Sequence, residues 1–340
     1  MPGGIGVIGL GRIVMEGHMP SYLDAGLDVV AAADLNPEAV AEFRRRYPGV
    51  ASVGEDIEAV LADEDVAFVD IATPPSTHAE LIRAAADHGK SVLVQKPLAL
   101  SLDEAIEVVG YAEERGVTLA VNHNLRYMPC NQAVKGWLEE GSIGEPHLLT
   151  LEYHTTLDYG PWRAALAHMI ISEVVVHHLD LTRWWLGPLD RLFTEEGVAA
   201  SSTDGVATVA STSGRTESGA VFHLVCDLLN PGDAPILKVR IDGENGSIRS
   251  DGRIARRYTR EPLEVWEETV PGPGDWKQGI GFMPAFAAIM SDFQDAVDSG
   301  RAPLTDAKDN LQTLGAVFAA HQAADSGSVV GDLAAIGSRL

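Results

Sequence analysis

The chain has 340 residues, of which 46 % are hydrophobic and 22 % are charged, and its formal net charge at pH 7 is −24. That length suggests two domains of ordinary size, and the composition is typical of a globular protein with enough apolar residues for a large core. The strong negative charge argues against nucleic acid and anionic membranes as partners.

The sequence carries no recognisable secretion or membrane signal. The apolar start of the chain has no basic segment before it and is interrupted by glycine, and no apolar run is long enough to span a membrane. Cys130 and Cys226, the two cysteines, form neither a CxxC motif nor part of a ligand cluster. We therefore expect a cytoplasmic protein, because reducing compartments keep thiols free.

Residues 1–122 alternate short apolar runs with helical patterns, which is typical of an α/β domain with a doubly wound parallel sheet. The predicted strands are Gly4–Ile8, Val29–Ala33, Phe68–Ile71, Ser91–Val94 and Thr118–Val121. The helical patterns between them include Pro37–Tyr47, His78–His88 and Leu102–Arg115.

From about residue 145 the pattern changes to strand-like segments separated by turn residues, which predicts an open, mostly antiparallel sheet. The predicted strands are Pro146–Thr155, Val206–Thr212, Gly219–Cys226, Leu237–Ile241 and Gly246–Ser250. The predicted helices are Ser172–Leu186, Pro284–Ser299 and Asp306–Ala324. We assign residues 123–340 to a second, α+β domain.

A dinucleotide-binding motif follows the first predicted strand. The segment Gly9–Val14 has two of the three glycines of G-x-G-x-x-G; the first permits a tight turn and the second lets the backbone approach a pyrophosphate. Asp34 ends the second strand 23 residues after Gly11, where a carboxylate can bind the adenosine ribose. The two residues after Asp34 supply no cation for a 2′-phosphate, so NAD is favoured over NADP. The alternative is that Asp34 only caps the helix that begins near Pro37.

The helix predicted over Ser172–Leu186 carries a second candidate site. On a regular α-helix Glu173, His177, Asp180 and Trp184 share one face, while the opposite face is apolar. A buried core histidine is the alternative for His177, and a metal site is the alternative for the whole group. We expect no metal, because no cysteine or third well-placed imidazole lies nearby.

Together these motifs resemble the Gfo/Idh/MocA oxidoreductases. The resemblance extends over nearly the whole chain and rests on Gly9–Val14, Asp34, Ala72–His78, Gln95-Lys96-Pro97, Arg126–Pro129, Trp162-Arg163, Glu173…His177…Asp180, Gly243…Ser247 and Pro284…Phe293. It implies an N-terminal Rossmann domain and a C-terminal open sheet that often forms the dimer interface. It also implies hydride transfer between NAD(P) and a sugar, polyol or cyclitol.

The resemblance and the chemistry of alcohol oxidation suggest roles for individual residues. His177 is the expected base, Lys96 would hold the substrate oxygen, and Glu173 is the third catalytic candidate. The predicted cofactor-binding residues are Gly9, Gly11, Arg12, Ile13, Asp34, Thr73, Pro74, His78, Gln95 and Lys96. The predicted substrate-binding residues are Lys96, Arg126, Tyr127, Trp162, Arg163, Glu173, His177, His178 and Asp180; a structural role for His178 is equally compatible with the sequence.

Three departures from the family pattern suggest a subfamily with its own substrate. Gln95 replaces a glutamate and removes a negative charge near Lys96, and Glu173 replaces an aspartate. The segment 167–169 replaces a glycine-rich stretch.

The leading hypothesis is an NAD-dependent sugar or polyol dehydrogenase of carbohydrate metabolism. A redox-neutral NAD-dependent glycoside hydrolase and a non-catalytic NAD-binding regulator are the alternatives. The alternation of Val221, His223 and Val225 along one strand leaves a sheet face that needs cover, so we expect a homodimer or homotetramer.

Overall fold

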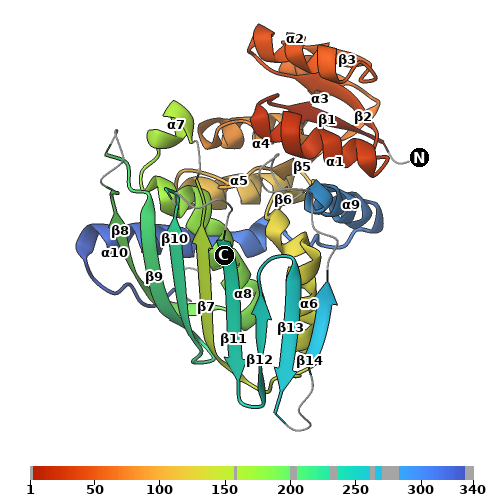
Figure 1. Ribbon diagram of the computed structural model, residues 1–340. Helices are drawn as coiled ribbons and strands as arrows, with labels where there is room; N and C mark the ends of the chain where they lie inside the picture. Colours follow the sequence, from red (N-terminus) through yellow and green to blue (C-terminus); the bar gives the residue numbers. More distant parts are fainter. Residues whose placement is uncertain are drawn as a thin grey trace. The chain divides into compact units, whose positions relative to one another are not determined.

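The computed structural model describes residues 3–156, 159–199, 205–229, 236–260, 265–269 and 283–333 (Figure 1). It contains two compact units, Met1–Asn124 with Gln278–Leu311, and Leu125–Lys277 with Gln312–Leu340. The sequence predicted one boundary after residue 122 and not the return of α9 (Met283–Ser299) to the first unit. Phe286 and Phe293 of α9 pack on His18 and Phe68, which are contacts between distant segments that local sequence patterns do not reveal.

The first unit contains a six-stranded parallel sheet in the order β3-β2-β1-β4-β5-β6, which confirms the predicted doubly wound fold. The strands are β1 (Gly4–Ile8), β2 (Val29–Ala33), β3 (Ser52–Gly54), β4 (Val66–Ile71), β5 (Ser91–Val94) and β6 (Leu119–Val121). The sequence did not predict β3, because its three residues form no apolar run.

The helices of the first unit begin with local signals that the sequence displays. Asn36 caps α2 by accepting the Glu38 N–H, with Pro37 at the first helical position. The Ser101 side chain caps α5 by accepting the Glu104 N–H. The helices are the π-helix Val14–His18, α1 (Met19–Asp24), α2 (Pro37–Arg46), α3 (Ile57–Ala62), the 3₁₀-helix Pro75–Thr77, α4 (His78–Asp87), α5 (Leu102–Glu114) and α9. A further 3₁₀-helix, Asn124–Tyr127, spans the unit boundary.

The second unit contains an eight-stranded sheet in the order β14-β13-β12-β11-β7-β10-β9-β8. Only β7 and β10 pair in parallel, so the predicted mostly antiparallel sheet is confirmed. The strands are β7 (Pro146–His154), β8 (Leu189–Gly197), β9 (Val209–Thr216), β10 (Val221–Asp227), β11 (Ile236–Gly243), β12 (Gly246–Ser250), β13 (Ile254–Thr259) and β14 (Val265–Thr269). The helices are α6 (Pro129–Glu139), α7 (Gly160–Ala164), the π-helix Ile171–Val175 and α8 (Val176–Leu186). A further helix, α10 (Ala307–Ser326), begins in the first unit and continues into the second after Leu311.

The two faces of this sheet differ in their cover. Phe222, Leu224 and Cys226 of β10 are buried on the face where α6 and α8 pack, whereas the alternate residues of the strand point to the other face. In the part of the chain that the structure describes, no helix lies on that second face (Figure 1). None of the described helices is long and apolar enough to cross a membrane.

Candidate functional site

The glycine loop after β1 has the geometry that a dinucleotide requires. Gly9 has φ +92°, and a Cβ there would lie 2.8 Å from the backbone of Ala72, so only glycine fits. A Cβ on Gly11 would meet no atom within 4 Å, which leaves open space beside its backbone. Arg12 and Ile13 are the first helical residues after the loop, and Arg12 is exposed and paired with Glu16 at 2.9 Å. The loop therefore suits a pyrophosphate at Gly11.

Asp34 connects this loop to the end of β2. Its Oδ2 accepts the Leu10 N–H at 2.6 Å and its Oδ1 accepts the Asn36 N–H at 2.8 Å. The cap of α2 is Asn36 and not Asp34, so the alternative reading of Asp34 as the helix cap is wrong. A carboxylate held at this position beside the glycine loop fits the ribose of a dinucleotide.

His78 joins two loops at the carboxyl edge of the parallel sheet. Its Nε2 lies 2.9 Å from the Thr73 carbonyl oxygen and its Nδ1 lies 3.0 Å from that of Pro97. The ring is buried, and burial lowers the pKa of His78, with a smaller contribution from the positive charge of Lys96. His78 thus fixes the Thr73-Pro74 loop and the Lys96-Pro97 loop at the edge where ligands of such sheets bind.

A buried polar cluster that the sequence analysis missed lies in the same unit. His18 and Asp70 have no exposed surface, and His18 Nδ1 lies 2.7 Å from Asp70 Oδ2. Gln95 extends the cluster, since its Nε2 lies 2.9 Å from His18 Nε2. The signal that could have revealed it is Asp70 itself, an acid inside the apolar strand β4.

In the second unit, the segment that carries Glu173 is a π-helix, Ile171–Val175, which continues into α8. The prediction of a shared face assumed a regular α-helix from residue 172, whereas a π-turn is wider and changes the relative direction of Glu173 and His177. Short π-helices are frequent at functional sites, and the first unit has one directly after its glycine loop. Glu173 is 7 % exposed, and His177 is half-buried.

Glu173 has a cationic partner from α7. Arg163 Nε donates to Glu173 Oε2 at 2.8 Å, and the Arg163 guanidinium lies 4.2 Å from the centroid of the Trp162 ring. Trp162 is 41 % exposed, so its ring is accessible to a ligand. This row of Trp162, Arg163 and Glu173 brings together three predicted substrate-binding residues, and an exposed indole beside charged hydrogen-bonding groups suits a polyhydroxylated molecule.

Arg126 and Asp180 form a buried ion pair. Both Asp180 oxygens accept from Arg126, at 2.8 and 2.7 Å, and Thr313 Oγ1 also donates to Asp180 at 2.9 Å. The side chains of the pair are 4 % and 1 % exposed. The pair is thus buried and held within the protein, and its predicted contact with substrate stays a prediction.

His178 is buried in the second unit. It is 3 % exposed, its Nδ1 lies 3.2 Å from Cys226 Sγ, and it packs edge-on against Tyr153. Burial lowers the pKa of His178 to about 3, so it is neutral at physiological pH. These contacts favour the structural role that the sequence left open for His178, and its contact with substrate stays a prediction.

Family models match both units of the chain. Residues 4–123 match the oxidoreductase family with an NAD-binding Rossmann fold, and residues 131–249 match the GFO/IDH/MocA C-terminal domain. The chain belongs to the Gfo/Idh/MocA family of oxidoreductases. The resemblance inferred from its motifs is thereby confirmed.

Several known members of the family are similar along almost the entire chain. A D-apiose dehydrogenase of Paraburkholderia graminis is 29 % identical over 92 % of this chain and 85 % of its own. A second D-apiose dehydrogenase, of Rhizobium rhizogenes, is 28 % identical over 95 % of this chain and 96 % of its own. An oxidoreductase from Agrobacterium radiobacter, solved with NAD⁺, L-tartaric acid and magnesium, is 27 % identical with a TM-score of 0.89, and the match covers 100 % of both chains.

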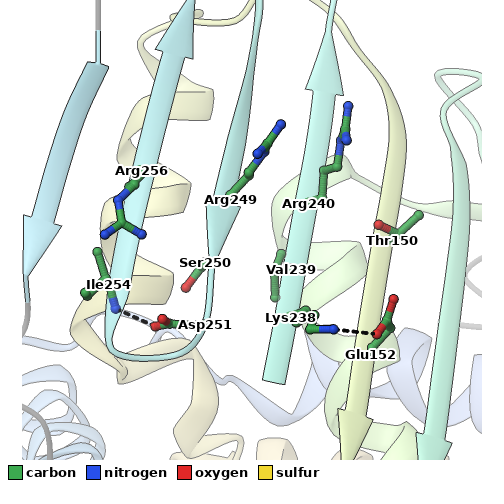
Figure 2. A pocket seen from close by; sticks show the side chains of 10 residues that line it. All are labelled: Thr150, Glu152, Lys238, Val239, Arg240, Arg249, Ser250, Asp251, Ile254 and Arg256. Carbon is green, nitrogen blue, oxygen red and sulfur yellow. Dashed lines mark hydrogen bonds and ion pairs between the residues drawn. The ribbon is translucent and has the colours of Figure 1, made fainter. Parts of the chain in front are cut away.

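The open face of the eight-stranded sheet contains a separate hollow of about 340 Å³ (Figure 2). It is lined by residues of β7, β11, β12 and β13 and the turns beside them, with four cations and two acids among them, and by none of the predicted site residues. Among the described residues, no group of three or more histidine, cysteine or acidic side chains is placed to hold a metal ion.

Proposed function

We propose that this protein is an NAD-dependent dehydrogenase that moves a hydride between the nicotinamide and a secondary alcohol or hemiacetal carbon of a sugar, polyol or cyclitol. The observation that carries the proposal is the fitted dinucleotide loop, Gly9 to Asp34, in a chain of this family that also has Lys96 and His177. The two D-apiose dehydrogenases support a sugar as the substrate class and a role in carbohydrate metabolism.

The residues have distinct roles in this proposal. NAD, when bound, supplies the hydride acceptor at its nicotinamide ring. His177 removes the hydroxyl proton of the substrate, and Lys96 binds the same oxygen and stabilises its developing negative charge. Glu173 is held by Arg163 and binds substrate hydroxyl groups together with it, while Trp162 offers an apolar ring face to the sugar.

NAD is preferred over NADP in this proposal because Asp34 repels a 2′-phosphate. The carboxylate is fixed by the Leu10 and Asn36 N–H groups, so it cannot swing away to admit a second anion without losing both hydrogen bonds. We expect at least about tenfold tighter binding of NAD, which corresponds to about 1.4 kcal/mol. Equal or tighter binding of NADP in a titration would refute this role of Asp34.

A substrate panel tests the proposed activity. Aldoses including D-apiose, polyols and cyclitols are each incubated with the protein and NAD, and NADH is followed by its absorbance. Accumulation of NADH with one class is the expected result. Cleavage of a glycoside without net NADH would instead identify a redox-neutral hydrolase, and NAD binding without turnover of any member would favour a regulator.

We further propose that a second copy of the chain covers the open sheet face. Arg240, Arg249 and Arg256 are directly opposite one another on β11, β12 and β13, and like charges in such cross-strand pairs repel one another (Figure 2). Within the chain, Asp242 pairs with Arg240 at 2.9 Å. Glu152, Asp227 and Glu195 lie on the same face over β7, β10 and β8. Arg191 and Arg215 share that part of the face, so the acids there are interspersed with cations. A two-fold axis through the face would place the arginine row of one copy over this part of the other. A homodimer is thus the smallest assembly we expect, and a homotetramer would pair two of them.

The cytoplasm is the compartment we propose. Cys130 and Cys226 are both buried free thiols in the structure. Burial raises the pKa of Cys130 to about 11, so its thiol is unreactive at neutral pH. Because neither cysteine forms a disulfide, a reducing agent such as a thiol reductant should leave the activity unchanged.

A further inference from the structure

The buried cluster around His18 lies directly behind the residue that precedes Lys96. Gln95 follows β5 and Asn122 follows β6, and backbone hydrogen bonds from Gln95 N–H to Ile71 and from Asn122 N–H to Val94 align them at the ends of adjacent strands. The strand register places Asp70, Gln95 and Asn122 on the same side of the sheet. His18 covers that side from the end of the π-helix, with its ring 4.7 Å from that of Phe286.

The hydrogen bonds of the cluster locate the ring proton of His18. Asp70 Oδ2 accepts from the Tyr22 hydroxyl at 2.9 Å and faces His18 Nδ1 at 2.7 Å. Burial, followed by the charge of Asp70, raises the pKa of Tyr22 well above its usual value, so the phenol keeps its proton. A carboxylate accepts and does not donate, so the proton between Asp70 and His18 belongs to Nδ1.

The other ring nitrogen then faces two amide groups. His18 Nε2 lies 2.9 Å from Gln95 Nε2 and 3.5 Å from Asn122 Nδ2. An amide nitrogen can only donate, so Nε2 is the acceptor and the ring carries one proton. Asp70 Oδ1 and Asn122 Oδ1 are buried and have no hydrogen-bond partner among the described residues. Buried oxygens without a hydrogen-bond partner lower the stability of the fold. A role in positioning Gln95 therefore explains the cluster better than a contribution to stability does.

We propose that His18 and Asp70 are positioning residues for the proposed dehydrogenase reaction, and that His18 in its neutral Nδ1–H form holds Gln95 by the amide nitrogen and thereby fixes the chain at Lys96. The inference rests on the proposed function for its consequence in catalysis but not for its hydrogen-bond chemistry. It also explains why Gln95 stands where the family has a glutamate, because the glutamine amide can donate a hydrogen bond to the neutral His18 ring.

The pairing of the Gln95 amide donor with the His18 Nε2 acceptor predicts that His18 changes its protonation when Gln95 is replaced by glutamate. In Gln95→Glu the new carboxylate cannot donate to Nε2, and the contact is restored if one proton is taken up. An imidazole is ordinarily a stronger base than a carboxylate, so that proton goes to the ring. His18 would then be a cation between the introduced carboxylate and the carboxylate of Asp70. The substitution therefore adds one negative charge and takes up one proton at the same site.

Nitrogen NMR of the protein labelled with ¹⁵N in histidine tests the chemistry without substrate or cofactor. The His18 signals are assigned by their loss in His18→Phe. We expect one protonated nitrogen, Nδ1, in the wild type at pH 7 and two in Gln95→Glu at the same pH. A doubly protonated ring or an Nε2–H ring in the wild type, or an unchanged ring in Gln95→Glu, would overturn the inference even if the proposed activity is right.

Kinetics with the substrate found in the panel test the positioning role. His18→Phe removes the acceptor for Gln95, and we expect kcat to fall roughly 10- to 100-fold with a smaller change in KM, because misplacement of a reacting group affects the chemical step most. His18→Gln restores an acceptor oxygen and should recover part of the loss, which a merely structural effect would not show. His88→Phe, at an exposed histidine of the same unit, is the matched control. Wild-type kcat in both His18 variants would refute the role.

Discussion

At the scale of single residues, the candidate site residues of each unit are polar groups held by partners from other segments of the chain. Glu173 is held by Arg163, Asp180 by Arg126 and Thr313, and Gln95 by His18. Motif spacing was enough to propose the candidate residues, since the proposed chemistry requires those residue types. Their partners were not predictable, because an ion pair such as Arg126–Asp180 joins positions 54 residues apart with no local pattern to indicate it.

Lys96→Ala and His177→Ala should each lower kcat by about 10²- to 10⁴-fold, because oxyanion stabilisation and general base catalysis contribute about that much. Steady-state kinetics with the panel substrate measure the loss, and NAD titration should show retained binding. His147→Ala, at an exposed histidine, is the control for His177. Normal turnover by either variant would show that the proposed role of that residue is incorrect.

His178 should make the fold sensitive to acid. Its pKa is lowered to about 3 in the folded protein by burial, whereas an unfolded histidine has a pKa of about 6.5. Between these values the unfolded chain binds more protons, so stability falls as pH decreases from about 6.5 to about 3.

We therefore expect His178→Leu to weaken the pH dependence. The wild type should lose about 2 kcal/mol of unfolding free energy through His178 between pH 7 and pH 5, and the variant should lack that part of the loss. Denaturant unfolding at the two pH values measures it, with the exposed His147→Leu as control. An equal pH dependence in His178→Leu would argue that His178 is not the group responsible.

At the scale of elements, the apolar periodicities predicted β1, β2, β5 and β12 with the bounds that the structure has. Local patterns could not reveal the two π-helices, because a π-turn and an α-turn use the same residues and differ in which backbone groups pair. The second π-helix begins three residues after His168, which has φ 48°. The His168 carbonyl accepts the N–H groups of Ile171 and Ser172, and its Nδ1 lies 2.5 Å from Glu196 Oε2.

Because His168 has a left-handed backbone, we expect His168→Gly to be more stable than His168→Ala, the reverse of the usual order. Both His168→Ala and His168→Gly lose the contact with Glu196, but only glycine adopts this φ without strain. His168→Gly should therefore be more stable than His168→Ala by about 1 kcal/mol, whereas at an ordinary position glycine is the less stable. Denaturant unfolding measures the free energy of unfolding of both variants. A more stable alanine variant would mean that the backbone at His168 is unstrained.

At the scale of the whole molecule, sequence and structure agree on a Rossmann unit followed by a unit with an open sheet, and the family models match both. The strand alternation on β10 was predictable, because side chains alternate with period two, but the row of arginines on β11, β12 and β13 depends on strand pairing and emerged only from the structure. That row is the strongest reason to expect a second copy on the face.

Light scattering over a dilution series should detect a dimer or a multiple of it at micromolar concentration. Arg249→Glu places a negative charge in the centre of the basic row, and we expect it to raise the dissociation constant at least about tenfold. Arg45→Glu, at an exposed arginine of the first unit, should leave assembly unchanged. A monomeric wild type, or equal assembly in Arg249→Glu, would mean that this face is not the interface.

In the proposed reaction, a hydride moves from a sugar carbon to NAD and stays there. The most direct test uses the best panel substrate with deuterium at the carbon to be oxidised, and mass analysis of the cofactor after turnover. We predict that the deuterium appears in NADH in proportion to the product formed. Product formation with the deuterium still on the sugar, and no accumulated NADH, would refute net hydride transfer to NAD.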